Sequence, residues 1–283
     1  MYLRHFGLTQ SPFSETPSSQ FFLELNNAGI LFRELIHAVN QPDGFIIVLG
    51  EPGIGKSTLY RKLWKAVLSH KSRYIALTLG HPPLTESSLY ASIGQELDIA
   101  RKPAATLRDR VLKKLEVLAG QGKHLVLLID EAQAIPEKVL EALLFLSEQM
   151  QNKRKLVQIV LFAQPEFTEK IARPRLQRLQ ERITLTLQLH PVKEDDIPQY
   201  VTLRLSKCCW QGDPLFTPKA INLLAKASSG VPRVINVLAH KAMMLAYGAG
   251  ESSVGETHVT TAITETASAD QSSIKAGLPW FSR

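Results

Sequence analysis

The sequence has few cysteines and no long apolar run. Its two cysteines, Cys208 and Cys209, are neighbours, and adjacent cysteines rarely form an unstrained disulfide. Apolar runs such as Phe45–Leu49 and Leu125–Ile129 are far shorter than the roughly 20 residues of a transmembrane helix. The first residues also lack an apolar segment of signal-peptide length. These absences exclude a disulfide-stabilised secreted protein and a membrane-spanning one, so we expect a reduced, cytoplasmic protein.

Acidic residues are fewer than basic ones, with 26 Asp and Glu against 33 Lys and Arg, which gives a net charge of +7. The excess is concentrated, because residues 151–190 hold 8 basic and 3 acidic residues and so account for 5 of the 7 surplus charges. A basic stretch of this kind indicates contact with a negatively charged partner. The overall charge by itself does not establish a membrane-surface role.

The stretch from Phe45 to Leu59 contains a phosphate-binding motif. Phe45–Leu49 predicts a strand buried on both faces, and the P-loop pattern Gly-x-x-x-x-Gly-Lys-Ser follows at 50–57. Glycines let backbone N–H groups turn inward toward a polyphosphate, and the next helix adds its N-terminal N–H groups. Lys56 suits the β and γ phosphates, and the Ser57 hydroxyl suits Mg²⁺. The sequence therefore predicts nucleoside triphosphate binding. The residues assigned to the nucleotide are Gly50, Glu51, Pro52, Gly53, Ile54, Gly55, Lys56, Ser57 and Thr58.

Two acidic residues, Asp130 and Glu131, follow the apolar run Leu125–Ile129. They stand at the carboxyl end of a predicted strand, where open α/β sheets bind ligands. Asp130 suits Mg²⁺, directly or through water, and Glu131 suits the orientation and polarisation of an attacking water. This Walker B arrangement predicts hydrolysis as well as binding. Gln164, which follows a further apolar run, is placed to reach the γ-phosphate or the water beside Asp130.

Apolar strands separated by amphipathic helices predict an α/β fold with a mostly parallel five-stranded sheet. The predicted strands are Phe45–Leu49, Tyr74–Leu79, Leu125–Ile129, Leu156–Phe162 and Ile183–Leu189. The last alternates polar and apolar residues, as strands near a sheet edge do. The later predicted helices are Glu194–Lys207, Pro218–Ser228, Pro232–Tyr247 and Glu256–Glu265. We therefore divide the chain into an arm and α/β core at 1–190, a helical domain at 191–267 and a loose tail at 268–283.

The arm at residues 1–22 is rich in aromatic residues. Two interpretations stand. The arm packs on the surface of the domain, or it lines the base and ribose side of the nucleotide, since a P-loop contacts only the phosphates.

Three segments resemble the GspA/ExeA group of AAA+ ATPases of bacterial secretion. They are Tyr2–Ser14, Ala163–Phe167 (Ala-Gln-Pro-Glu-Phe) and Gly230–Asn236 (Gly-Val-Pro-Arg-Val-Ile-Asn). Ala163 stands where the group usually has glycine. Within the group, the chain most resembles the members that serve the mannose-sensitive haemagglutinin (MSHA) type IV pilus. The resemblance implies an AAA+ core followed by a small all-helical lid.

The resemblance also implies roles for four further side chains. Arg233 corresponds to the sensor-2 arginine of the lid, and Gln164 to the sensor-1 position. Arg182 resembles the arginine finger that one subunit inserts into its neighbour's site. Arg178 is the alternative finger, and a solvated basic helix is the third interpretation of this segment.

We expect an ATP hydrolase that uses ATP and Mg²⁺, assembles into homo-oligomers through ATP-bridged interfaces, and supports type IV pilus or secretion apparatus biogenesis. Its expected partners are other copies of the chain and apparatus proteins, with peripheral inner-membrane placement through those partners. The alternative is a DNA-binding ATPase regulator resembling transposition helper proteins, suggested by Lys153, Arg154, Lys155, Arg173 and Arg175. A GTPase is disfavoured because Asn152-Lys153-Arg154-Lys155 lacks the acid that would recognise guanine.

Overall fold

The computed structural model describes residues 2–16, 18–25, 27–41, 45–99, 106–152, 154–267 and 269. The chain divides into two compact units. The sheet unit comprises Ile30–Pro52 and Lys56–Leu189, and the helical unit comprises Met1–Gly29, Gly53–Gly55 and His190–Arg283.

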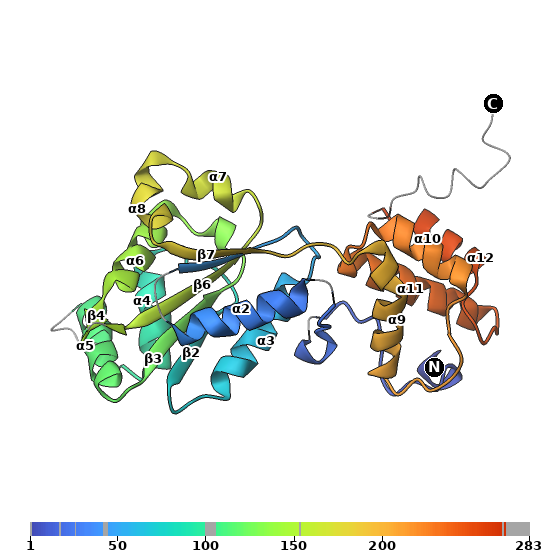
Figure 1. Ribbon diagram of the computed structural model, residues 1–283, viewed down its shortest axis with the longest axis horizontal. Helices are drawn as coiled ribbons and strands as arrows, with labels where there is room; N and C mark the ends of the chain where they lie inside the picture. The colour runs from blue at the N-terminus through green and yellow to red at the C-terminus, as the bar shows by residue number, and fades with distance from the viewer. Residues whose placement is uncertain are drawn as a thin grey trace. The chain divides into compact units, whose positions relative to one another are not determined.

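A five-stranded sheet in the order β2-β3-β6-β1-β7 forms the centre of the sheet unit (Figure 1). Its strands are β1 (Phe45–Leu49), β2 (Tyr74–Leu79), β3 (His124–Ile129), β6 (Val157–Ala163) and β7 (Ile183–Gln188). All four strand pairs are parallel. The predicted fold class and the five predicted strands are therefore confirmed. Because β3, β6 and β1 are neighbours in a parallel sheet, the segments that follow them emerge at one edge.

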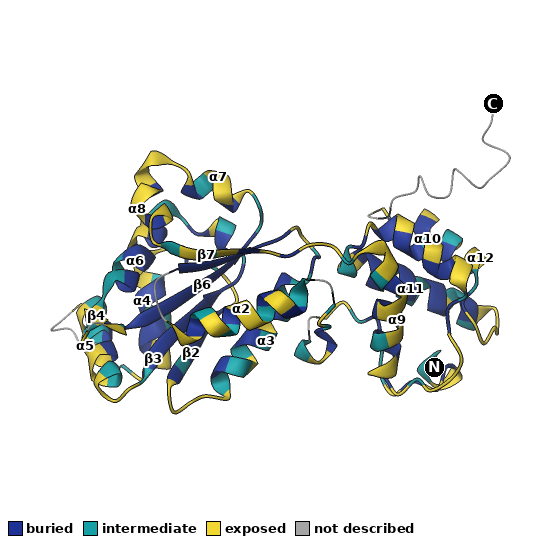
Figure 2. Ribbon diagram, viewed as in Figure 1, coloured by how far each residue is buried: buried dark blue, intermediate teal, exposed yellow. Residues whose placement is uncertain are grey.

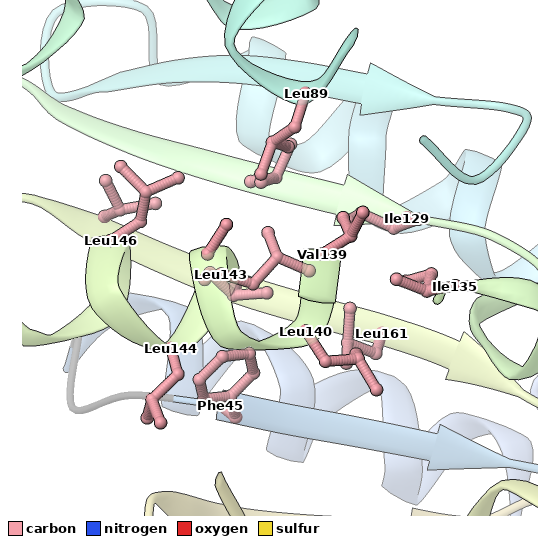
Figure 3. Close-up of a cluster of buried hydrophobic side chains, with 14 of the residues drawn as sticks. Phe45, Leu89, Ile129, Ile135, Val139, Leu140, Leu143, Leu144, Leu146 and Leu161 are labelled. Atoms are coloured by element: carbon pink, nitrogen blue, oxygen red, sulfur yellow. The ribbon is translucent and has the colours of Figure 1, made fainter. Parts of the chain in front are cut away.

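Alternate strand residues face two helical layers, because successive side chains point to opposite faces of a sheet. The helices are α4 (Glu86–Glu96), α5 (Leu107–Gly120) and α6 (Glu137–Glu148) on one face, and α2 (Ala28–Asn40) and α3 (Lys56–Leu68) on the other. Phe45 and Leu161 share a buried cluster with Leu143 of α6 (Figure 3). On the other face, the Tyr60 ring meets Phe162 edge to face, with 5.4 Å between ring centroids.

Burial along the strands follows their position in the sheet. Every residue of β1, β3 and β6 is buried, whereas in β7 every second residue is exposed (Figure 2). β7 lies at one edge of the sheet, as its alternating sequence predicts. The three strands whose carboxyl ends hold the candidate site are thus enclosed on both faces.

The sheet unit also has three short elements, of which only the last lies in a segment for which a helix, solvated and basic, is among the interpretations of the sequence. A two-stranded hairpin joins β4 (Met150–Gln151) to β5 (Arg154–Lys155), and two short helices follow β6, namely α7 (Phe167–Ile171) and α8 (Gln177–Gln180). Strands of two residues and helices of four or five are too short to show a hydrophobic period. Asn152 of the hairpin turn has a φ of 50°, a conformation that asparagine adopts more readily than most residues.

The helical unit is built around four helices and the N-terminal arm. The helices are α9 (Ile197–Ser206), α10 (Pro218–Ser228), α11 (Pro232–Gly248) and α12 (Glu256–Thr264), and the arm begins with α1 (Tyr2–His5). Phe6, Phe13 and Phe21 of the arm lie in the same buried cluster as these helices. Arg204 of α9 is also buried, and its Nε donates to the carbonyl oxygen of Pro12 at 2.6 Å.

The arm therefore groups with the helices and not with the sheet, which differs from the assignment of residues 1–190 to one domain. The physical reason is that its aromatic side chains are buried among apolar side chains of α9 to α12. The last crossing of the chain from the sheet unit to the helical unit falls between Leu189 and His190, one residue before the predicted domain boundary. Of the predicted tail at 268–283, only Ala269 lies within the described residues. None of the helices in the described ranges is long and apolar enough to cross a membrane.

Candidate nucleotide-binding site

The P-loop connects the carboxyl end of β1 to the first turn of α3. The Gly50 N–H donates to the Ala163 carbonyl oxygen at 3.2 Å, which ties the start of the loop to the end of β6. Gly53 and Gly55 have φ angles of 80° and 108°, a region that residues with a Cβ rarely adopt. Helix α3 begins directly at Lys56, so the unpaired N–H groups of its first turn follow the loop at once. This backbone fits a polyphosphate.

The Lys56 side chain is buried inside this loop. Its Nζ donates to the carbonyl oxygens of Gly50 at 2.6 Å and Glu51 at 3.0 Å. Burial lowers the pKa of the Lys56 ammonium, while the nearby carboxylates, Glu131 first, oppose that shift. A buried ammonium among carbonyl oxygens at the start of a helix is well placed for phosphate oxygens, which are stronger acceptors.

Ser57 and Asp130 form a pair of oxygen ligands beside the P-loop. The Ser57 hydroxyl donates to Asp130 Oδ2 at 3.0 Å, and the Glu131 N–H donates to Asp130 Oδ1 at 3.0 Å. Burial raises the pKa of the Asp130 carboxyl, and these two hydrogen bonds oppose the shift. Mg²⁺ prefers hard oxygen ligands and usually takes only one or two from protein, the rest coming from phosphates and water. The donor set fits magnesium, and the described residues hold no cluster of three or more His, Cys, Asp or Glu that would form a different metal centre.

Glu131 lies beside Asp130 and is held by two glutamine amides. The Gln164 Nε2 donates to Glu131 Oε2 at 3.3 Å, so the structure brings together Glu131 and Gln164, which follow neighbouring strands. Gln133 Nε2 donates to the same carboxylate oxygen. Glu131 itself has a left-handed backbone, with a φ of 53°. Sequence reasoning assigned no role to Gln133, although it lies only two residues beyond Glu131 and carries a side chain that both donates and accepts.

The comparisons with known proteins agree with this geometry. Residues 39–171 match the family model described as an AAA domain. The chain is 34% identical, over 258 residues and 90% of its length, to general secretion pathway protein A of Aeromonas hydrophila. The chain thus contains an AAA domain and resembles the GspA/ExeA group of AAA+ ATPases. It spans 46% of the length of that relative.

Solved structures support the same fold at low sequence identity. The ORC2 protein of Aeropyrum pernix, solved as ADPNP-ADP complexes, matches with a TM-score of 0.68 and 18% identity, over 95% of this chain and 74% of that one. The RuvB Holliday junction branch migration motor of Thermotoga maritima matches with a TM-score of 0.55 and 18% identity, over 84% of this chain and 68% of that one. At such identities the likeness establishes the fold alone.

In this GspA/ExeA-like chain, the two candidate finger arginines lie far from the P-loop. The N–H of Phe45, at the amino end of β1, donates to the Arg182 carbonyl oxygen at 3.2 Å. The P-loop follows the carboxyl end of β1. Five residues at about 3.3 Å each separate that end of the strand from its amino end by roughly 16 Å. Both arginine side chains are exposed and face Glu148, at 3.8 Å from Arg182 and 3.1 Å from Arg178. Neither is brought to the site of its own sheet unit.

Arg233, the sensor-2 candidate, stands in the first turn of α11 within the helical unit. Its Nε lies 4.0 Å from Glu15 Oε2, and both side chains are mostly exposed. Its backbone N–H donates to the carbonyl oxygen of Gly53, which the same unit includes, at 3.1 Å. A Cβ added at Gly53 would lie 2.8 Å from the Arg233 Cβ, so glycine is required there for space as well as for backbone conformation.

Proposed function

We propose that this GspA/ExeA-like chain binds and hydrolyses MgATP and assembles through ATP-bridged interfaces. The observation that carries the proposal is the Ser57 hydroxyl bonded to Asp130 at 3.0 Å beside the buried Lys56, with Glu131 next along the chain. These side chains, which we propose as a phosphate ligand, two magnesium ligands and a base, lie at one edge of the sheet. Each of these groups has a role in enzymes that transfer a phosphoryl group to water.

In the proposed mechanism, the P-loop N–H groups and Lys56 bind the triphosphate, while Ser57 and Asp130 hold the metal. Bound magnesium would neutralise the negative charge that develops on the phosphate oxygens. Glu131 accepts a proton from the attacking water and orients it. Gln164 contributes an amide beside that carboxylate. The residues in contact with nucleotide would be Gly50, Glu51, Pro52, Gly53, Ile54, Gly55, Lys56, Ser57, Thr58, Asp130 and Arg233.

Assembly follows from where the arginines lie. Arg182 lies at the opposite end of β1 from the P-loop of its own sheet unit, too far for its side chain to reach that loop. A role at the γ-phosphate would therefore require the site of a second copy of the chain. Arg233 is proposed to contact the same phosphate from the lid, and the ATP cycle would then shift the lid between two states. The basic residues of the segment 151–190 would face the triphosphate of the neighbouring subunit.

The biological role that we propose is support of a type IV pilus of the MSHA kind, or of a related secretion apparatus. The 34% identity to general secretion pathway protein A supports the secretion role. We place the chain in the cytoplasm, at the inner membrane only through its partners. Those partners would be other copies of the chain and proteins of the apparatus.

The assembly proposal predicts turnover that rises with protein concentration and depends on Arg182. We expect Arg182→Ala to bind MgATP normally and to lose turnover by about ten- to hundredfold at assembling concentrations, because one charge-assisted hydrogen bond to the transition state is lost. Phosphate release and size-exclusion chromatography, each with and without MgATP, measure the two effects. Arg61→Ala, at an exposed position of α3, is the matched control.

Unchanged turnover in Arg182→Ala together with a loss in Arg178→Ala would move the finger to Arg178. Turnover that is independent of concentration, with no change in size on MgATP, would refute assembly while leaving the subunit's own ATPase intact.

A second candidate function, DNA binding, is favoured by one observation on α3. No acidic residue occurs from Pro52 to Thr85, whereas six basic ones do. Those six are Lys56, Arg61, Lys62, Lys65, Lys71 and Arg73. Arg61 and Lys65 lie one turn apart on the exposed side of α3, and Lys71 is exposed just beyond its end. Two of the basic residues that suggest DNA binding from the sequence give it less support: Lys153 lies outside the described residues, and Arg173 is paired with Glu137 at 2.7 Å.

On the DNA-binding hypothesis, a duplex should bind with a Kd in the low micromolar range at physiological salt and more tightly at low salt, because phosphate binding releases counterions. The triple variant Arg61→Gln, Lys65→Gln and Lys71→Gln should bind DNA more weakly by about tenfold or more. The slope of log K against log salt concentration should become shallower by roughly one unit for each phosphate contact that is lost. Lys113→Gln with Lys114→Gln on α5 is the charge control. Binding that is absent at physiological salt, or equal in the triple variant and the control, would exclude this function for the α3 face.

A further inference from the structure

Gln133 makes a hydrogen bond at each end of its side-chain amide. Its Nε2 donates to Glu131 Oε2, and its Oε1 accepts the backbone N–H of Gln164 at 3.2 Å. A carboxylate can only accept and an N–H can only donate, so these two partners fix which end of the amide is nitrogen. Gln133 thus links the segment after β3 to the segment after β6.

The backbone around Gln133 is anchored as firmly as its side chain. It lies in a short 3₁₀ turn, Ala132–Ala134, between the fully buried residues Ala132 and Ile135. Lys170 of α7 donates from Nζ to the carbonyl oxygen of Gln133 at 2.8 Å and to that of Ile135 at 2.5 Å. The amide therefore has a fixed base from which to hold another side chain.

Both glutamine amides donate to the same oxygen of Glu131. Gln133 and Gln164 each contact Oε2, and neither donates to Oε1. The Glu131 backbone is left-handed, a conformation that costs a non-glycine residue energy and persists only where neighbouring groups determine it. Gln133 supplies such a constraint, because it binds the Glu131 side chain from two residues away.

We propose that Gln133 is a positioning residue that holds the Glu131 carboxylate by Oε2, so that Oε1 is presented to the attacking water, and that keeps Gln164 in register with it. This inference rests on the proposed ATPase function and deepens it. Gln133 acts through Glu131 and does not itself contact the nucleotide. Its loss should therefore lower kcat and leave the Kd for MgATP unchanged.

The test compares two substitutions that keep the length of the side chain. Gln133→Met removes both hydrogen bonds, and we expect kcat to fall by about ten- to hundredfold, the range for loss of a hydrogen bond to a charged group. Gln133→Glu keeps the acceptor for the Gln164 N–H but places a second carboxylate beside that of Glu131. The kcat of this variant should fall at least as far as that of Gln133→Met. Gln149→Met is the matched control, because Gln149 is equally half-buried and its amide donates to a backbone oxygen, that of Phe145, at 2.8 Å. Its kcat should be that of the unchanged protein.

A double-mutant cycle separates positioning from general weakening of the fold. In the Glu131→Gln background, followed under single-turnover conditions, Gln133→Met should cause no further loss, because coupled residues are not additive. An additive loss, or a raised Kd for MgATP with normal kcat, would overturn the proposal.

A crystal structure of Gln133→Met gives a readout that does not depend on activity. We expect the Glu131 carboxylate to leave its place beside Gln164, and an unmoved carboxylate would overturn the inference. If the unchanged protein shows no turnover, the ATPase proposal fails, and the structure of the variant alone decides whether Gln133 positions Glu131.

Discussion

Lys56→Ala is expected to abolish MgATP binding and, with it, turnover. The Lys56 ammonium is buried in the P-loop and donates to two loop carbonyl oxygens, those of Gly50 and Glu51. When phosphates enter, it exchanges these neutral acceptors for charged ones. Two charge-assisted hydrogen bonds, at about 1.5–3 kcal/mol each, correspond to a loss of affinity on the order of 10²–10⁴-fold.

The side chain of Lys56 has an aliphatic stem as well as a charge, and the two contributions can be separated. Lys56→Met keeps most of the stem and removes the ammonium, so it should lose nearly as much affinity as the alanine variant. The burial that lowers the pKa of Lys56 also means that the ammonium has little water to exchange for phosphate. The charge is therefore the larger contribution.

Isothermal titration calorimetry with MgATP measures this loss directly, and thermal unfolding checks that each variant is folded. Lys65→Ala is the matched control, because Lys65 lies on the exposed side of the same helix. It should bind MgATP as the unchanged protein does. A folded Lys56→Ala protein with undiminished affinity would remove the P-loop assignment and every role that depends on it.

The sheet and the two nucleotide motifs could be predicted from the sequence because each leaves a local signal. Strands β1 and β3 are buried on both faces, so they appear as unbroken apolar runs. The P-loop needs glycines at fixed positions, and the two acids must follow a strand. Once β1 and β3 lie parallel on either side of β6, their carboxyl ends share one edge of the sheet, and Ser57 and Asp130 are brought together.

Features that depend on contacts between distant segments could not be predicted in this way. The arm is an example. Its phenylalanines could be buried against either unit, and only the fold shows that they belong to the buried cluster of helices α9 to α12. The buried Arg204 that donates to Pro12 has no sequence signal either, since arginine is usually exposed. The link from Gln133 to Gln164 joins residues after two different strands and appears only when those strands are adjacent.

The two adjacent acids have different proposed roles, Asp130 at the metal and Glu131 at the attacking water. Substitution of Glu131 should therefore affect turnover and leave MgATP binding unchanged. Asp130 is bonded through both oxygens, to Ser57 and to the Glu131 N–H. Its position beside Ser57 suits the magnesium site that we propose. Glu131 is bonded through Oε2 to side-chain amides alone, so its other oxygen is the one suited to a water. Removing the charge of Glu131 should leave binding intact and stop the chemistry.

Glu131→Gln is therefore expected to bind MgATP with unchanged affinity and to lose turnover by about 10²–10⁴-fold, the usual contribution of a general base. The substituted amide keeps the shape of the side chain and one oxygen that accepts from Gln133 or Gln164. The variant should hold ATP, so the larger species formed on MgATP should persist in size-exclusion chromatography, whereas that of the unchanged protein decays as ATP is consumed. Single-turnover phosphate release gives the rate.

Glu169→Gln is the matched control for this prediction, because Glu169 is an exposed acid on α7 and undergoes the same chemical change. Its turnover should equal that of the unchanged protein. Retained hydrolysis in a folded Glu131→Gln protein would take the water-activating role away from Glu131 and leave Lys56, Ser57 and Asp130 as a site for binding only. Loss of binding together with turnover would place Glu131 among the groups that bind MgATP in the ground state, and not among those that act only in the chemical step.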